Sequence, residues 1–170
     1  MAFSTRFGIR DLTTAAMAAA MAVLLGYLKI YRLPQGGSIT LETVPIIFVA
    51  LLRSARLGLF AGFITGGLKL LFGPFIVHPV QLLLDYPFPF ALLGFSAVLP
   101  RTPRIGVLLG NLARWFSHFT SGVVFFGSYA PEGISVWRYS ALYNLSYIGP
   151  EAFIALLLVP LLLRRISDRT

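Results

Sequence analysis

Three polar side chains lie within long apolar stretches of this sequence. Asp85 belongs to the apolar run that begins near His78, His118 to the run that follows Arg104, and Asn144 to the last run of the chain. Polar side chains are costly in a lipid bilayer, so each needs a partner or a function. An aspartate can balance a cation, whereas a neutral histidine and an asparagine can each donate and accept hydrogen bonds. Together they predict a site for a polar ligand that bears positive charge.

Aromatic side chains accompany these polar groups. Phe126, Tyr129 and Tyr139 are close to them in the sequence. Their rings can stack on a flat ligand or face a cation. The sequence therefore favours a pocket for a planar heteroaromatic cation. Taken alone, Trp137 and Tyr139 are also typical of the aromatic belts at membrane surfaces.

The composition indicates a membrane protein. Of the 170 residues, 57% are hydrophobic and 12% are charged, and the mean hydropathy is +0.82. A soluble domain of this size could not bury so much apolar surface. We expect a single membrane domain over residues 1–170. The chain has no Cys, which excludes disulfides and thiol-ligated metals, and we expect neither a metal site nor a cofactor.

The apolar segments predict an all-α membrane protein with six transmembrane helices. The expected spans are Leu12–Tyr31, Leu41–Leu52, Leu57–Phe72, His78–Leu99, Ile105–Ser128 and Tyr139–Leu163. The second and third are shorter than the roughly 20 residues that a bilayer requires. At 1.5 Å per residue, Asp85, His118 and Asn144 lie about 10, 15 and 7 Å below the outer ends of their helices. This similar depth favours one shared site that opens outward.

Positive charge distinguishes the two sides of the membrane. Connections on one side carry Arg6, Arg10, Arg53, Arg56, Arg101, Arg104, Arg164, Arg165 and Arg169, whereas those on the other carry Lys29, Arg32 and Arg138. Because cytoplasmic loops hold the excess of Lys and Arg, both termini are expected to be cytoplasmic. The same distribution accounts for the net charge of +8 without nucleic acid as a partner.

Two further acids have expected partners. Arg114 and Glu151 fall about 21 and 18 Å below the outer ends of their helices, so we expect them to neutralise each other near the midplane. This pairing leaves Asp85 free for a ligand. We expect Glu42 to form a surface pair with Lys29 or Arg32, which are nearby in the sequence.

Small residues recur every four positions in two segments. The pairs are Ala15 with Ala19, Ala16 with Ala20, and Ala18 with Ala22 in the first segment, and the third segment has Gly58, Gly62 and Gly66. This spacing lets helices approach closely in lipid. We expect the glycines to pack within the chain. For the first segment, internal packing and contact with another protein both stay open.

Four stretches together resemble the thiamine-specific substrate-binding (S) component of energy-coupling factor (ECF) transporters. They are LPQGGSITLETVPI (residues 33–46), HPVQLLLDYP (78–87), HFTSGVVFFGSYAPEG (118–133) and YSALYNLSYIGPE (139–151). The resemblance implies a six-helix protein of the cell membrane that captures thiamine at the outer face, with the loop after the first helix closing over it. It implies transport rather than catalysis. The chain has no GxxxxGK[ST] phosphate loop, so ATP hydrolysis is expected from separate subunits.

The resemblance also assigns residues. It places Asp85, Tyr86, Arg114, His118, Gly122, Phe126, Tyr139 and Asn144 at the thiamine site, with Phe126 where some members have a stacking Trp. The loop RLPQGGSIT lacks the Trp of some relatives, so Gln35 or Tyr31 is expected to cover the ligand instead. The implied partners are a transmembrane coupling subunit and two ATP-binding subunits. The docking face of the first helix would fall on Ala15 and Ala19.

Three alternatives stay open. The same architecture could bind another vitamin, such as riboflavin, or a thiamine precursor, and a neutral ligand would not need Asp85. An intramembrane enzyme could use His118 and Asp85 as acid and base, although the chain has no HExxH or GxSxG motif. A scaffold could use the first helix only to hold partners.

Overall fold

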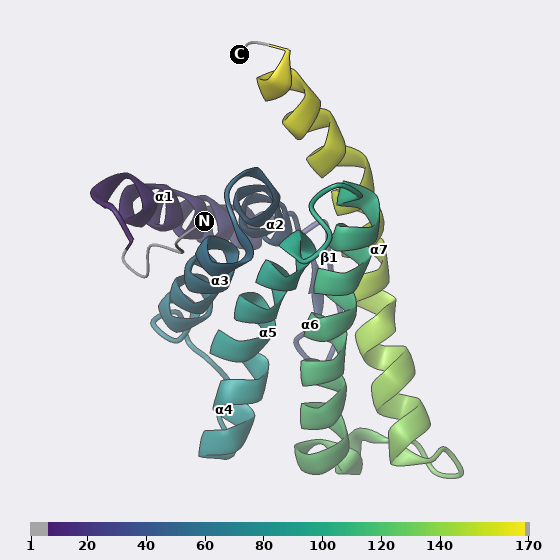
Figure 1. The fold of residues 1–170 in the computed structure, drawn as a ribbon. Helices are drawn as coiled ribbons and strands as arrows, with labels where there is room; N and C mark the ends of the chain where they lie inside the picture. The colour runs from purple at the N-terminus through teal and green to yellow at the C-terminus, as the bar shows by residue number, and fades with distance from the viewer. Residues whose placement is uncertain (1–6, 169–170) are drawn as a thin grey trace.

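The computed structural model describes residues 7–168, so Arg6 and Arg169 of the charge comparison lie outside the described residues. Within this range the chain is a bundle of helices with one short hairpin (Figure 1). The elements are α1 (Ile9–Tyr27), β1 (Tyr31–Arg32), β2 (Ser38–Ile39), α2 (Thr43–Leu52), α3 (Ala55–Lys69), α4 (Pro79–Asp85), α5 (Pro87–Leu92), the 3₁₀-helix η1 (Leu93–Ala97), α6 (Pro103–Phe125), the 3₁₀-helix η2 (Gly127–Tyr129) and α7 (Val136–Ser167). Each of the six predicted spans overlaps at least one of these helices.

Helix α2 lies at the centre of the bundle. It contacts α1, α3, η1, α6 and α7, and most of its side chains are buried. Its apolar residues join those of α5, η1, α6 and α7 in one core, which includes the fully buried Ile46, Phe90 and Leu93. Because it contacts five other elements and is mostly buried, helix α2 holds the other helices together from inside the bundle. Its ten residues span about 15 Å, which is half the thickness of a bilayer core.

The first helix ends before its predicted boundary. Helix α1 stops at Tyr27, and Tyr31–Arg32 instead pairs antiparallel with Ser38–Ile39. Gly36, with φ of +96°, lies in the turn between the two strands, where an L side chain would be strained. Because the chain folds back here, the N–H of residue 30 bonds to the C=O of residue 39 at 2.9 Å instead of continuing the helix.

The alanine face of α1 packs inside the chain. Ala15 and Ala18 contact Val49 of α2 and apolar residues of α3 in a second apolar cluster. Ala15 and Ala19 are both 0% exposed, so a partner subunit cannot reach their side chains. The prediction that these two residues form a docking face was therefore wrong. Ala16 and Ala20 lie on the exposed side of the helix instead.

The glycines of α3 allow close contact with the neighbouring segment. A Cβ atom at Gly62 would overlap the carbonyl of Phe90, and one at Gly66 would overlap the carbonyl of Tyr86. Only glycine can approach a backbone so closely at these positions. The predicted internal packing of this stripe is confirmed.

The fourth predicted span is divided in two. Asp85 ends α4, Tyr86 is non-helical with φ of −118° and ψ of −80°, and Pro87 begins α5. Proline restricts the residue before it and cannot donate a backbone hydrogen bond. The prediction of one continuous helix from residue 78 to residue 99 missed this break. As a result, Asp85 lies at a joint between two short helices.

Helices α6 and α7 lie side by side and form one wall of the bundle (Figure 1). The 32 residues of α7 correspond to about 48 Å of helix, more than the roughly 30 Å of a bilayer core. Its C-terminal turns project beyond the other helices in Figure 1. Both α6 and α7 begin before their predicted spans, and α7 also ends later.

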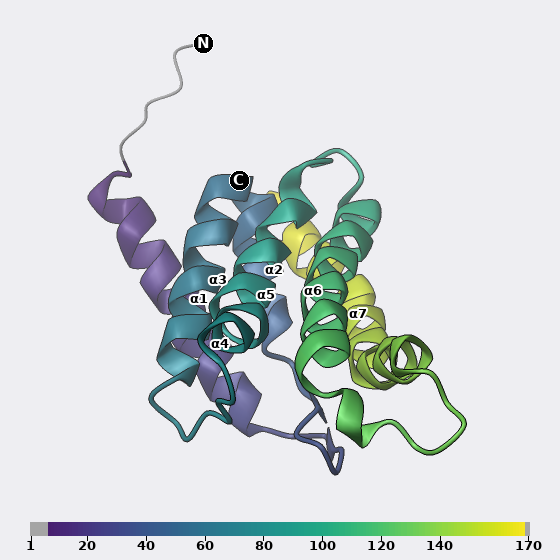
Figure 2. The ribbon, with the colours of Figure 1, turned by 90° about the horizontal axis from the view of Figure 1, so that it is seen from below.

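Within the described residues, three helical segments are long and apolar enough to cross a membrane, Ile9–Tyr27, Pro79–Ala97 and Val136–Ser167. These segments support a membrane-embedded helical protein, whereas the count of six spans stays a prediction. Figure 2 shows the α1–α2, α3–α4 and α6–α7 connections gathered along one edge of the bundle. The site described below lies under these three connections.

Candidate functional site

A cavity of about 590 Å³ lies between the helices at this edge. It is lined by nine residues that the sequence analysis placed at a ligand site, namely Gln35, Asp85, Tyr86, Arg114, His118, Gly122, Phe126, Tyr139 and Asn144. These residues come from the α1–α2 loop, the joint between α4 and α5, helix α6 with the residue that follows it, and helix α7. The fold therefore brings the predicted residues to one place, and their roles in binding stay predictions.

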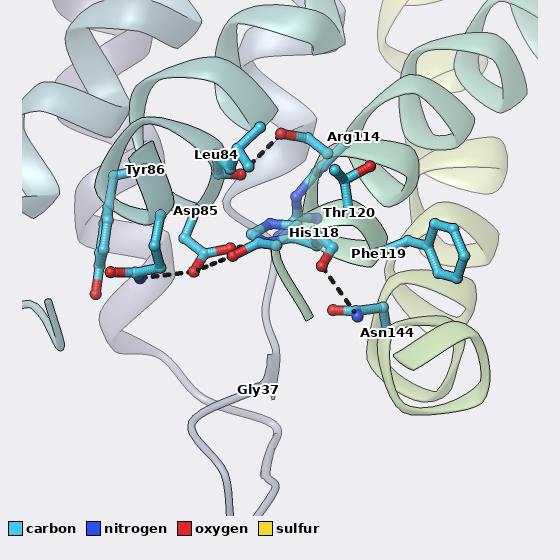
Figure 3. A network of polar contacts seen from close by, with 12 residues as sticks. Gly37, Leu84, Asp85, Tyr86, Arg114, His118, Phe119, Thr120 and Asn144 are labelled. Atoms are coloured by element: carbon cyan, nitrogen blue, oxygen red, sulfur yellow. Dashed lines mark hydrogen bonds and ion pairs between the residues drawn. The ribbon is translucent and has the colours of Figure 1, made fainter. Parts of the chain in front are cut away.

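Asp85 points toward His118 of α6 and contacts that helix directly (Figure 3). Its Oδ1 lies 3.2 Å from Nδ1 of His118, and its Oδ2 accepts hydrogen bonds from Ser121 Oγ at 2.9 Å and from Gln81 Nε2 at 2.7 Å. Among the described residues, no Arg or Lys forms a salt bridge with this carboxylate. Asp85 therefore has hydrogen-bond donors around it but no side chain with a permanent positive charge.

His118 presents one free ring nitrogen. Because a carboxylate only accepts hydrogen bonds, Nδ1 carries a proton toward Asp85. The opposite nitrogen, Nε2, is buried and has no hydrogen-bond partner among the described residues. A buried nitrogen without a partner is unfavourable. In the neutral ring this atom is an acceptor that a ligand N–H or O–H could satisfy.

Asn144 and Gly122 shape the contact between α6 and α7. Asn144 Nδ2 donates to the carbonyls of Ser140 at 2.9 Å and of His118 at 3.4 Å, and its Oδ1 accepts from the Tyr147 hydroxyl at 2.7 Å. A Cβ atom at Gly122 would overlap Ser140 Oγ. These contacts fix the backbone that carries His118, and the second lone pair of Asn144 Oδ1 is left for a ligand.

Two groups of aromatic rings line the cavity. In one group, Phe126 packs against Phe75 and Tyr129, with ring centroids 6.2 and 6.1 Å apart. In the other, Tyr139 and Tyr143 stack with centroids 5.8 Å apart and an interplanar angle of 25°. All five rings line the cavity. Such surfaces suit a flat ligand and attract a cation.

The floor of the cavity is a network of charges in which Glu42, Arg114 and Glu151 are buried and Lys69 is partly exposed. Arg114 pairs with Glu151 and also with Glu42, at 3.4 Å, and Lys69 Nζ lies 2.5 Å from the other oxygen of Glu42. The predicted pairing of Arg114 with Glu151 is confirmed. Two cations and two carboxylates balance one another, so the floor neither attracts nor repels a charged ligand strongly.

The expectation for Glu42 was wrong. Glu42 is only 3% exposed and contacts Lys69 and Arg114 rather than Lys29 or Arg32. The reason is its position directly before α2, the central helix, which directs the side chain into the bundle.

The loop between α1 and α2 is attached to α7 at two points. The N–H of Gly37 donates to the Tyr143 hydroxyl at 2.9 Å, and Thr40 bonds to Glu151. Gln35 of this loop lines the cavity as expected. Tyr31 is 61% exposed and does not line it, so Gln35 is the one of the two candidates that lies over the cavity.

Several cavity residues were missed in the sequence-based site. They are Glu42, Lys69, Phe75, Gln81, Tyr143 and Tyr147. The spacing of Tyr139, Tyr143 and Tyr147 at every fourth position could have indicated one helix face. The charge of Lys69 at the end of an apolar segment could likewise have indicated a cavity residue. No pattern marks Phe75, which lies in a loop.

Comparison with known proteins identifies the family. A family described as "Thiamine transporter protein" matches residues 12–169. The chain belongs to the thiamine transporter protein family. It is therefore assigned to a family of transporters, and the intramembrane-enzyme interpretation is set aside.

Two curated members of the thiamine transporter family are similar over most of their length. The thiamine transporter ThiT of Bacillus subtilis is 36% identical over 173 residues, covering 91% of this chain and 90% of the relative. The thiamine transporter ThiT of Lacticaseibacillus paracasei is 31% identical over 149 residues, covering 76% of this chain and 74% of the relative.

A solved structure shares the fold. ThiT from Listeria monocytogenes superposes with a TM-score of 0.86, covering 94% of this chain and 96% of that chain at 24% sequence identity. The helical arrangement of this thiamine transporter family member thus belongs to a fold that has been observed before.

Proposed function

We propose that this protein captures thiamine at the outer face of the cell membrane as the S component of an ECF-type importer. The observation that carries the proposal is the environment of Asp85, a carboxylate without an Arg or Lys partner among the described residues, in a cavity lined by aromatic rings. Thiamine is a cation made of two flat heteroaromatic rings. Membership of the thiamine transporter family supports this ligand.

The cavity residues bind different parts of the ligand, according to the chemistry of each side chain. Asp85 compensates the positive charge of thiamine, and the rings of Phe126 and Tyr139 supply flat surfaces for its rings. His118 Nε2 accepts a hydrogen bond from the ligand, which satisfies its unpartnered position. The neutral floor around Arg114 keeps positive charge from opposing the cation.

The α1–α2 loop closes the site over the ligand. Its Gly37 and Thr40 are already bonded to α7, and Gln35 lies at the cavity. Closure excludes water, which strengthens the electrostatic attraction between Asp85 and the cation. No bond of the ligand is made or broken.

Uptake requires partner subunits that supply energy. We propose a transmembrane coupling subunit and two ATP-binding subunits, with both termini of this chain in the cytoplasm, where the arginine-rich connections lie. Ala16 and Ala20, on the exposed side of α1, offer small side chains for close contact with the coupling subunit.

Calorimetry with thiamine on the detergent-purified chain tests this function. We expect saturable binding by the natural chain and at least tenfold weaker binding by Asp85→Asn, which keeps the size but removes the charge. Glu132→Gln, a change of an exposed acid in the α6–α7 loop, is the matched control and should bind normally. Absence of thiamine binding, or equal binding by Asp85→Asn, would point to a different or neutral vitamin.

A further inference from the structure

Gln81 is a buried residue next to the ligand carboxylate that the proposed function has not used. It lies one turn before Asp85 in α4, is 1% exposed and lines the cavity. Its amide makes three hydrogen bonds. Nε2 donates to Asp85 Oδ2 at 2.7 Å and to the carbonyl of Phe75 at 3.1 Å, and Oε1 accepts from the N–H of Val77 at 3.1 Å.

The chemistry of the partners fixes the orientation of this amide. The Asp85 carboxylate can only accept, so the NH₂ group must face it. The carbonyl oxygen is then left for the Val77 N–H. Both amide hydrogens are used, and the side chain cannot turn away without leaving a buried polar group unsatisfied.

Gln81 connects Asp85 to the loop between α3 and α4. This loop, residues 70–78, contributes Phe75 to the cavity wall, where its ring packs against Phe126. Its backbone at Phe75 is held from the other side by Tyr86, whose hydroxyl accepts from the Phe75 N–H at 2.8 Å. Gln81 of α4 and Tyr86 at the break therefore hold the same stretch of loop.

The other donors to Asp85 do not make this connection. Ser121 and His118 both belong to α6, and Ser121 Oγ contacts only the carboxylate among the hydrogen bonds of the described residues. Gln81 is thus the donor that links the Asp85 carboxylate to the loop. A change in the orientation of the carboxylate would shift the loop, and a shift of the loop would change the orientation of the carboxylate.

We propose that Gln81 is a positioning residue, which holds the Asp85 carboxylate in its ligand-binding orientation and fixes residues 75–77 at the cavity wall. The inference rests on the proposed function, because the ligand is taken to be thiamine. It assigns Gln81 a role in affinity that acts through Asp85 and not through direct contact with thiamine.

A double-mutant cycle tests the link to Asp85. Gln81→Met keeps the length of the side chain but removes its hydrogen bonds, and we expect about tenfold weaker thiamine binding by calorimetry. In the Asp85→Ala background, titrated to thiamine concentrations that saturate it, the same change should weaken binding less than about twofold, since contacts that act through one residue are not additive. An equal loss of thiamine affinity in both backgrounds would mean that Gln81 has a merely structural role, and would overturn the inference.

Ser117→Ala is the matched control. Ser117 lies on α6 and donates to the carbonyl of Leu84 at 2.7 Å, so it joins the same two helices without touching Asp85. Its variant should bind thiamine within about twofold of the natural chain. If Gln81→Met does not give a monodisperse protein, Gln81→Asn, whose amide is one methylene too short, replaces it in the cycle.

Hydrogen exchange tests the link to the loop without any ligand. The amides of Phe75 and Val77 are bonded to side chains of Tyr86 and Gln81, so Gln81→Met should speed exchange in peptides that cover residues 73–77 by tenfold or more. Peptides from residues 130–135 should be unchanged. Unchanged exchange at residues 73–77 would refute the inference even if thiamine binds, whereas a natural chain that does not bind thiamine refutes the proposed function first.

Discussion

Thr40 donates both its backbone N–H and its hydroxyl to the same oxygen of Glu151, at 2.8 and 2.7 Å. The other oxygen of this carboxylate pairs with Arg114. Thr40 belongs to the loop that covers the cavity, and Arg114 belongs to the floor of the cavity. One carboxylate in the middle of α7 therefore holds the cover and the floor of the cavity together.

Replacing Glu151 should destabilise the fold. Glu151→Gln leaves the positive charge of Arg114 partly uncompensated in a buried site, and breaking a buried ion pair costs about 3–5 kcal/mol. We expect a clearly lower apparent melting temperature of the detergent-purified protein. Glu132→Gln, which changes an exposed acid, should leave it unchanged. A Glu151→Gln variant as stable as the natural chain would show that Glu42 alone can neutralise Arg114.

Removing the Tyr143 hydroxyl should loosen the α1–α2 loop. In Tyr143→Phe the Gly37 N–H loses its acceptor, and loss of one such hydrogen bond is worth about 1 kcal/mol. We expect thiamine to dissociate about fivefold faster in stopped-flow measurements. Tyr31→Phe, on an exposed ring outside the cavity, is the control. Equal dissociation rates for the two variants would count against the attachment of this loop to α7.

Large side chains on the two sides of α1 should have different effects. Ala16→Trp and Ala20→Trp change exposed positions, so thiamine binding by the purified chain should persist while uptake by cells falls. Ala15→Trp and Ala19→Trp would place an indole where the side chain is 0% exposed, and should lower yield and stability before any effect on uptake. Normal uptake by Ala16→Trp and Ala20→Trp would place the coupling surface elsewhere.

A single methyl group at Gly62 should disturb the packing of α3. The Cβ of Gly62→Ala would overlap the carbonyl of Phe90, and overpacking of this kind costs about 1–3 kcal/mol. We expect a lower melting temperature. Gly67→Ala, where no atom lies within 4 Å of the new methyl group, should be neutral or slightly stabilising because alanine favours helix. Similar melting temperatures for the two variants would contradict this reading of the glycine stripe.

The sequence predicted which polar residues share the cavity better than it predicted the ion pairs around the cavity. Asp85, His118 and Asn144 could be grouped because polar side chains at similar depth in apolar helices have few reasons to be there. The partner of Arg114 followed from the same reasoning. Glu42 was misplaced because its neighbours in sequence, Lys29 and Arg32, were taken as neighbours in space.

The remaining differences come from long-range packing. Which alanines of α1 face inward depends on a rotation of about 100° per residue that the pairs Ala15–Ala19 and Ala16–Ala20 do not distinguish. The break at Tyr86 had a local signal in Pro87 and Pro89. The contact of Gln81 with Asp85 had a signal in their four-residue spacing on one helix face. Its contacts with Phe75 and Val77 had none, because no periodicity describes the path of that loop.

The joint at Tyr86 has a mechanical consequence. Rotation about the backbone bonds of this one residue would swing the seven-residue α4 against α5 while leaving the hydrogen bonds inside each short helix intact. Asp85 is carried on the swinging part, whereas His118 stands on the unbroken α6. A turn about the two torsion angles of Tyr86 would therefore change the separation between the Asp85 carboxylate and the His118 ring, and with it the shape of the site proposed to hold a cation.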